Sequence, residues 1–370
     1  MISKKIKNIT PVKIHNPKTV DLYSPWDLKK IAKIECINKD NVDQILDVSN
    51  NAFLNREKFL SKIERIKILK KSKNLLLKNS KKFAEIIAFE GGKPLKDSKI
   101  EVARAINGIE LCVEVLKKSH GTEIPMNLNS ASSNKIAFTR KFPIGTVLAI
   151  SAFNHPLNLI IHQVCPAVAA GCPIIIKPAL DTPATCYEFI KLLMEAGLPK
   201  EFCQMINIDN HAITHKLVSD PRISFFSFIG SAKVGWKLKS MLSPGTKCAM
   251  EHGGVGSVII DKGTNLKKIL PSILKGAFYH AGQVCVSIQK VIIHKDLVDQ
   301  FTSMLRDSVK KVKIGDPRDI NTDVGPLIRP SEVTRVDKVV KRAIKDGAEL
   351  ICGGAIKSKT TYECTVLKDP

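Results

Sequence analysis

Three segments of this 370-residue sequence carry side chains suited to covalent catalysis. Gly282-Gln-Val-Cys285 contains a cysteine among small and polar residues, and its thiolate could act as a nucleophile. Glu251-His-Gly-Gly254 offers a carboxylate that could serve as a general base. Asn154 follows a strand-like run, and its side-chain amide could donate a hydrogen bond to a developing oxyanion.

Each of these segments also has a structural interpretation. Most cysteines of a reduced protein are inert and buried, so Cys285 could be a core residue. Glu251 could belong to an ordinary polar turn just before a strand. Asn154 could be the N-cap of a helix that begins at about Pro156. Taken singly, the three segments leave both interpretations open.

A fourth segment, Phe228-Ile-Gly-Ser-Ala-Lys-Val-Gly235, follows a strand-like run and opens a helix. Glycine lets the backbone approach a ligand closely, and the free N–H groups of a helix start favour phosphate. Gly230, Ser231 and Gly235 are thus candidate cofactor residues, although a plain tight turn has the same spacing. For metals we predict no site, because His211 and His215 lie four apart on a predicted helix without a third ligand.

The segments that must position these residues differ in pattern along the chain. Residues 41–118 are helical in pattern, and residues 121–145 are polar and extended, as in a hairpin or arm. After Gly145, short apolar runs alternate with helical ones, the strands being expected near 146–153, 173–178, 203–207, 223–230 and 257–260. This alternation predicts an α/β fold with a Rossmann-like, doubly wound sheet. A second α/β unit, with helices near 296–311 and 331–346, follows residue 266.

Composition excludes several classes of function. The 58 basic and 35 acidic residues give a formal charge of +23, but the lysines are spread along the chain without a long block. No zinc finger or aromatic RNA-binding motif is present, so we predict a solvated basic surface and no nucleic-acid partner. The start has no apolar signal-peptide core, the apolar runs are too short for a membrane span, and the ten cysteines form no C-x-x-C pair. We therefore expect a cytoplasmic protein with no membrane partner.

Taken together and in order, the segments resemble the NAD(P)-dependent aldehyde dehydrogenase family. The resemblance covers most of the chain, and Glu251 precedes Cys285 by 34 residues, which is consistent with the family's spacing. It is carried by Asn16-Pro17, Glu90-Gly-Gly-Lys-Pro94, Phe153-Asn-His-Pro156, Lys177-Pro178, Phe228-Ile-Gly-Ser231, Glu251-His-Gly-Gly254 and Gly282-Gln-Val-Cys285.

The resemblance implies a role for each candidate residue. Cys285 would attack the aldehyde carbon to form a thiohemiacetal, whose oxygen would be held by the Asn154 amide and the backbone N–H of Cys285. Loss of hydride to the cofactor would leave a thioester, and Glu251 would activate the water that hydrolyses it.

For the cofactor, the resemblance places Lys177 near the adenosine ribose, Gly230 and Ser231 near the pyrophosphate, and Phe153 close to the pocket. Many NAD-preferring members carry an acidic residue three positions after this lysine, where this chain has Leu180. Either NAD or NADP is therefore expected.

We expect a cofactor-binding domain of residues 1–120 and 146–252, an oligomerisation arm of residues 121–145, and a catalytic domain of residues 253–370. Because family members continue beyond a segment like Thr365–Pro370, we also expect a catalytic domain that lacks its C-terminal part. The predicted substrate is an aldehyde, and small hydroxyaldehydes and semialdehydes are favoured. The predicted assembly is a homo-oligomer, either a dimer or a tetramer. The alternative is a non-catalytic remnant, or half of a split enzyme, that acts as a cofactor-binding scaffold.

Overall fold

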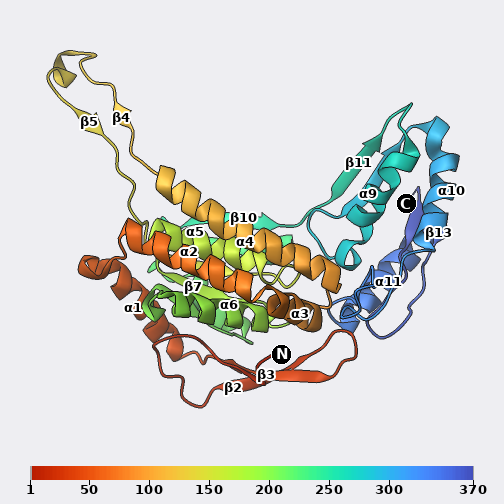
Figure 1. Ribbon diagram of the computed structural model, residues 1–370, viewed down its shortest axis with the longest axis horizontal. Coiled ribbons are helices and arrows are strands. Elements are labelled where there is room, and N and C mark those ends of the chain that lie inside the picture. The colour runs from red at the N-terminus through yellow and green to blue at the C-terminus, as the bar shows by residue number, and fades with distance from the viewer. Residues whose placement is uncertain (1, 370) are drawn as a thin grey trace.

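The central feature of the computed structural model, which describes residues 2–369, is a five-stranded parallel sheet (Figure 1). Its strand order is β10-β9-β6-β7-β8. The bounds are Thr146–Ile150 for β6, Ile174–Lys177 for β7, Cys203–Met205 for β8, Ile223–Gly230 for β9 and Lys247–His252 for β10. The chain runs from β6 to β7 and β8 on one side and to β9 and β10 on the other, so the sheet is doubly wound, as the sequence predicted.

Helices cover both faces of this sheet, and each face has its own apolar core. On one face lie α2 (Lys62–Lys78), α3 (Ser80–Gly91), α4 (Leu95–Lys118), α5 (Asn158–Ala170) and α6 (Pro183–Ala196). On the other lie α1 (Asn41–Leu54), α7 (His211–Val218) and α8 (Ala232–Lys239). The strands are apolar nearly throughout because both of their faces are buried.

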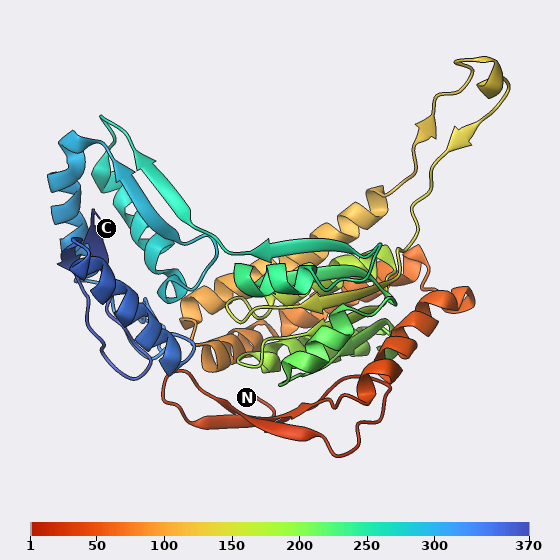
Figure 2. The same ribbon diagram turned by 180° about the vertical axis from the view of Figure 1, so that it is seen from behind.

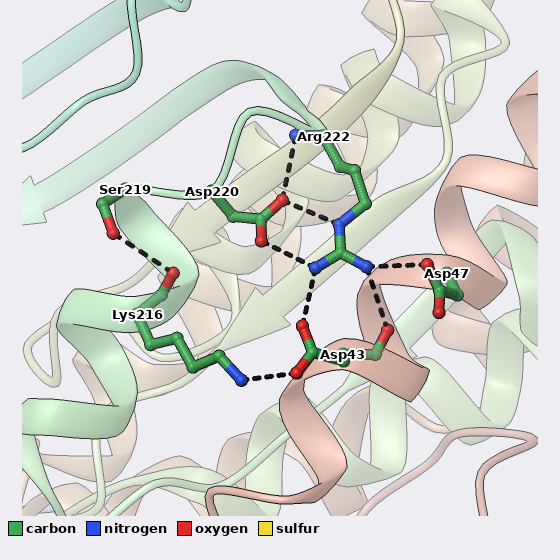
Figure 3. A network of polar contacts seen from close by, with 6 residues as sticks. All are labelled: Asp43, Asp47, Lys216, Ser219, Asp220 and Arg222. Atoms are coloured by element: carbon green, nitrogen blue, oxygen red, sulfur yellow. Dashed lines mark hydrogen bonds and ion pairs between the residues drawn. The ribbon is translucent and has the colours of Figure 1, made fainter.

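Polar contacts fasten α1 and α7 to the start of β9, as Figure 3 shows. Arg222, which immediately precedes β9, pairs with Asp220 at 2.7 Å, with Asp43 at 2.8 Å and with Asp47 at 2.6 Å. Lys216 of α7 binds Asp43 as well, at 2.5 Å. Since Asp43 and Asp47 lie one turn apart on α1, the network ties α1, α7 and β9 together.

The first forty residues form strands that the sequence analysis did not anticipate. A three-stranded sheet of order β1-β3-β2 contains β1 (Lys5–Ile6), β2 (Lys18–Tyr23) and β3 (Lys30–Cys36). Ile9 forms a bridge with Met205, so this sheet adjoins the end of β8.

Residues 121–145 leave the body as a two-stranded arm (Figures 1 and 2). The arm contains β4 (Glu123–Ile124) and β5 (Ala137–Phe138), which pair antiparallel. Its large apolar side chains are exposed, among them Leu128, Ile136, Phe138 and Phe142.

A second α/β unit lies beside the carboxyl ends of the central strands (Figure 2). It contains the parallel pair β11 (Gly256–Ile260) and β12 (Ile288–Ile293), the antiparallel pair β13 (Glu349–Cys352) and β14 (Val366–Lys368), and three helices. The helices are α9 (Leu266–Phe278), α10 (Val298–Val309) and α11 (Pro330–Lys345). Its buried side chains form separate apolar clusters from those of the central sheet.

Two sequence expectations about strands were wrong. Residues 257–260 belong to β11, which pairs with β12 rather than extending the doubly wound sheet. Glu251 lies within strand β10 rather than in a turn before a strand. Both errors have one cause: Lys247–His252 alternates exposed and half-buried residues, because this edge strand lacks the continuous apolar run of the inner strands.

Candidate active site

The candidate residues gather at the switch point of the doubly wound sheet, beyond the carboxyl ends of its strands. Asn154 lies in the segment that follows β6, Lys177 ends β7, Gly230 ends β9, and Glu251 is the penultimate residue of β10. Ligands of open α/β sheets bind at such a point because the connections on its two sides diverge.

Cys285 lies in a turn of residues 279–287, here called the cysteine turn, which connects α9 to β12. Its backbone is unusual, because His280 and Ala281 have φ of 50° and 55° and Gly282 follows at 73°. Cys285 is the one exposed cysteine of the ten in the described residues. Burial raises the pKa of several others, such as Cys186 and Cys203, so those thiols stay protonated and inert.

The structure brings the segment of Asn154 against the cysteine turn. The Asn154 Nδ2 group donates a hydrogen bond of 2.8 Å to the backbone carbonyl of Gln283, two residues before Cys285. An amide nitrogen carries two hydrogens, so one remains for another acceptor. The Gln283 side chain in turn accepts a hydrogen bond of 2.9 Å from the backbone N–H of Ile328.

The end of β10 also approaches the cysteine turn. A Cβ added at Gly254 would lie only 2.0 Å from the carbonyl oxygen of Cys285, and Gly254 has a φ of 150°. Only glycine allows both the close approach and this backbone conformation. Glu251, three residues earlier, is exposed, so its carboxylate is accessible to water.

The proposed cofactor residues lie on three neighbouring strand ends. Lys177 is largely buried at the end of β7, and burial lowers the pKa of its ammonium group. Phe153 is half-buried, and its carbonyl accepts a hydrogen bond of 3.4 Å from Thr182. Gly235 lets α8 pack closely on the sheet, because an added Cβ would meet His252 at 2.7 Å and Phe228 at 2.9 Å.

The start of α8 fits an anionic group. Ser231 is the N-cap of α8 and makes no side-chain cap hydrogen bond. Within residues 2–369 no side chain caps this helix, so its first N–H groups are available to a phosphate.

A buried polar cluster beneath the site had no predicted role, although Glu90-Gly-Gly-Lys-Pro94 was noted as a family segment. Glu90 accepts hydrogen bonds of 2.7 and 2.8 Å from the backbone N–H groups of Ala184 and Thr185 at the start of α6. Glu101 accepts hydrogen bonds of 3.0 and 3.1 Å from Leu157 and Asn158 at the start of α5, and it pairs with Lys93. A carboxylate between apolar helix positions is the sequence signal that could have marked both residues.

Taken together, a doubly wound sheet with an uncapped helix start and one accessible cysteine at its switch point defines an α/β protein of the nucleotide-binding kind. Comparison with known proteins narrows the class. The model of the aldehyde dehydrogenase family matches residues 12–370. This chain belongs to the aldehyde dehydrogenase family.

Individual relatives agree with this assignment. The chain is 35% identical to a 3-sulfolactaldehyde dehydrogenase of Priestia aryabhattai over 90% of its own length and 69% of the relative's. It is 31% identical to a lactaldehyde dehydrogenase of Methanocaldococcus jannaschii, with 95% and 75% of the two chains covered. A solved structure of glyceraldehyde-3-phosphate dehydrogenase from M. jannaschii, complexed with NADP, superposes with a TM-score of 0.90 at 30% identity and covers 95% of this chain and 76% of that one.

These comparisons confirm the predicted family, the α/β fold and the class of NAD(P)-dependent dehydrogenase. No helix among residues 2–369 is both long and apolar enough to cross a membrane.

Proposed function

We propose that this chain oxidises a small 2-hydroxyaldehyde to the carboxylic acid, with NAD or NADP as the hydride acceptor. The observation that carries the proposal is the convergence of Asn154, the end of β10 and the single exposed cysteine at the switch point of the sheet. The substrate class is supported by relatives that are named for lactaldehyde and sulfolactaldehyde.

In the proposed reaction, the Cys285 thiolate forms a bond from Sγ to the aldehyde carbon, and the carbonyl oxygen becomes an oxyanion. The free hydrogen of the Asn154 amide and the backbone N–H of Cys285 stabilise this oxyanion. When bound, the nicotinamide would supply the hydride acceptor that protein side chains lack, and loss of hydride from that carbon would leave a thioester on Cys285. Glu251 then takes a proton from a water molecule, whose oxygen attacks the thioester carbon; the carbon–sulfur bond breaks, and the acid and the Cys285 thiolate are released.

The residues proposed for the cofactor bind different parts of it at neighbouring strand ends. The N–H groups at the start of α8, with Gly230 and Ser231, bind the pyrophosphate, and Lys177 binds the adenosine ribose. Leu180 has no carboxylate with which to reject a 2′-phosphate, so we propose that both NAD and NADP are accepted. Residues 1–120 and 146–252 form the proposed cofactor-binding domain, and residues 253–370 the proposed catalytic domain.

We further propose that the arm of residues 121–145 joins copies of the chain into a dimer or tetramer, because its exposed apolar side chains would be buried by a partner. A cytoplasmic location fits the reduced cysteines. Sedimentation of the whole chain and of a variant with Phe138→Ser and Phe142→Ser tests the assembly, which should dissociate in the variant.

The test of activity uses purified protein, lactaldehyde or sulfolactaldehyde, and each cofactor, with absorbance at 340 nm as the measurement. Wild type should reduce at least one cofactor, and Cys285→Ser should abolish turnover. Cys248→Ser, which changes a half-buried cysteine of β10, is the matched control and should keep activity. Equal rates for wild type and Cys285→Ser would contradict the proposal, and cofactor binding without any turnover would support the scaffold alternative.

A further inference from the structure

The buried polar cluster beneath the site is the feature that the proposed chemistry does not use. Lys93 and Glu101 are 0% and 1% exposed, and His155, the residue after Asn154, is 9% exposed. Burying charge is costly unless it is paired, so such a cluster needs a reason. Its contacts reach the turn that carries Asn154 and also the cysteine turn.

Glu101 fixes the turn that carries Asn154. Residue Leu157, at the N-cap of α5, has no capping side chain, and the Glu101 carboxylate of α4 accepts the hydrogen bonds of the first α5 amides instead. Because Asn154 lies three residues before Leu157, this contact determines where the turn of residues 151–157 enters the helix. The turn is therefore held by a neighbouring helix rather than by its own sequence.

Lys93 and His155 complete the cluster. The Lys93 ammonium pairs with the Glu101 carboxylate and lies 2.8 Å from Nδ1 of His155. An ammonium group can only donate, so Nδ1 accepts and the neutral imidazole carries its proton on Nε2. Burial would raise the pKa of Glu101, but the paired Lys93 ammonium group outweighs it and lowers the pKa, so the carboxyl stays ionised.

The same cluster touches the cysteine turn. The His155 ring stacks on Tyr279, with centroids 5.9 Å apart and planes at 19°. The ammonium groups of Lys93 and Lys275 lie 5.7 and 4.8 Å from the centre of the Tyr279 ring. Lys275 is itself paired with Asp97 of α4. These two ammonium groups thus hold Tyr279, the first residue of the cysteine turn, close to the start of α4.

The two turns are consequently joined at two places. His155 stacks on Tyr279, and Asn154 donates to the carbonyl of Gln283. We propose that Lys93, Glu101 and His155 form a positioning device that holds Asn154 against the cysteine turn, with Glu101 as its central residue. The inference rests on the proposed function, since it assigns to Asn154 the oxyanion contact.

The chain provides a matched control. Glu90 is also fully buried, also lies on the helical layer, and also accepts the first amide hydrogen bonds of a crossover helix, in this case α6. Its partners are these two backbone N–H groups and the Thr185 hydroxyl rather than an ammonium group, and burial raises the pKa of Glu90 to about 7. Glu90→Gln therefore perturbs a buried helix cap without changing the link between the two turns.

The experiment compares Glu101→Gln with Glu90→Gln in steady-state kinetics and in backbone hydrogen exchange read by mass spectrometry. Removing one oxyanion donor costs about 10²–10³ in kcat, so displacing Asn154 should lower the kcat of Glu101→Gln by about 10–100-fold, with KM within about threefold. Exchange should accelerate in both peptides 152–160 and 279–288. Glu90→Gln should accelerate exchange only near residues 183–187 and keep kcat within about threefold of wild type.

Tyr279→Leu is the second variant, because it removes the ring that joins the cluster to the cysteine turn without leaving a buried charge unpaired. It decides the question if Glu101→Gln does not fold, and it should also lower kcat more than it changes KM. Normal kcat in a folded Glu101→Gln or Tyr279→Leu protein overturns the inference, as does faster exchange confined to residues 152–160. A wild type without dehydrogenase activity overturns the proposed function instead, and the exchange data then still test the link between the turns.

Discussion

Gly254 offers the sharpest test of how closely the end of β10 meets the cysteine turn. A Cβ at this position would lie 2.0 Å from the Cys285 carbonyl oxygen, 2.8 Å from its carbonyl carbon and 3.1 Å from its Cα. These are backbone atoms, which cannot turn aside as a flexible side chain does. Contacts of this kind essentially never fall below 3.0 Å, so Gly254→Ala must separate the two segments by at least 1.0 Å.

The expected effect on catalysis follows from that displacement. A misplacement of about 1 Å can cost about 10²-fold in rate, because it takes the reacting groups out of line. We expect Gly254→Ala to lower kcat by about that factor. The alanine also costs about 1–2 kcal/mol in stability, because it must adopt a positive φ.

Gly253 supplies the control for this backbone strain. It has a φ of 75°, but an added Cβ there would lie 3.7 Å from the nearest atom, the Cβ of Ala232. Gly253→Ala therefore also places an alanine at a positive φ, but without the collision. The comparison of kcat between the two variants isolates the effect of moving the cysteine turn.

The assay measures kcat, urea unfolding and the rate at which iodoacetamide alkylates Cys285, with all three determined on both variants. Gly253→Ala should lose stability and keep kcat within about fivefold, whereas Gly254→Ala should lose both. If the two variants have the same kcat and the same alkylation rate, the close approach of Gly254 to Cys285 does not position the thiol, and the reasoning fails.

Three further predictions concern separate parts of the molecule. Glu251→Gln should keep the single-turnover burst of cofactor reduction but slow steady-state turnover by about 10²–10⁴-fold, as stopped-flow absorbance will show; loss of the burst would mean that Glu251 acts before hydrolysis. Burial, together with the nearby Lys93 charge, holds the pKa of His280 well below its ordinary value, so the folded state keeps His280 neutral while the unfolded chain gains a proton below about pH 6.5. The free energy of unfolding should therefore fall as the pH drops from 6.5. In urea titrations, His280→Asn should reduce that fall by up to about 1.4 kcal/mol per pH unit, and asparagine tolerates the φ of 50° at this position. Equal slopes of unfolding free energy against pH in wild type and variant would refute this. Arg222→Leu should lower the free energy of unfolding by about 1–3 kcal/mol and leave kcat unchanged, since it leaves Asp47 and the largely buried Asp220 without an ion pair while Asp43 keeps Lys216. An unchanged unfolding midpoint would show that the network of Figure 3 is not stabilising.

The sequence allowed the central sheet to be predicted because its inner strands are continuous apolar runs separated by helical segments. Thr146–Ile150 is buried at every position, and such a run has few other structural meanings. The edge strand Lys247–His252 and the N-terminal strand Lys18–Tyr23 were not recognised, because each has one exposed face and many charged residues. Their pairing depends on neighbours far away in the chain, which local patterns do not encode.

For the proposed site, residue types and spacing singled out candidate segments but did not predict the contacts between them. Nothing in the local sequence indicates that Asn154 hydrogen-bonds to Gln283, or that Gly254 rather than Gly253 touches Cys285. The contacts of Glu101 were equally unpredictable, because its partners at residues 157 and 158 lie more than fifty positions away. Long-range geometry of this kind emerges only when the packed helices and strands bring distant segments together.

The capping of the crossover helices explains why one of the helix starts at this sheet can bind an anion. A helix N-terminus carries free N–H groups and a partial positive charge, so it attracts a phosphate unless a side chain already occupies it. Glu101 occupies the start of α5, Glu90 that of α6, and Asn210 that of α7. Among the described crossover helices that follow strands of the central sheet, α8 alone has no capping side chain. The buried carboxyl groups thus do more than stabilise the helical layer: they occupy the competing helix starts and leave the start of α8, beside Gly230 and Ser231, as the site we propose for the cofactor pyrophosphate.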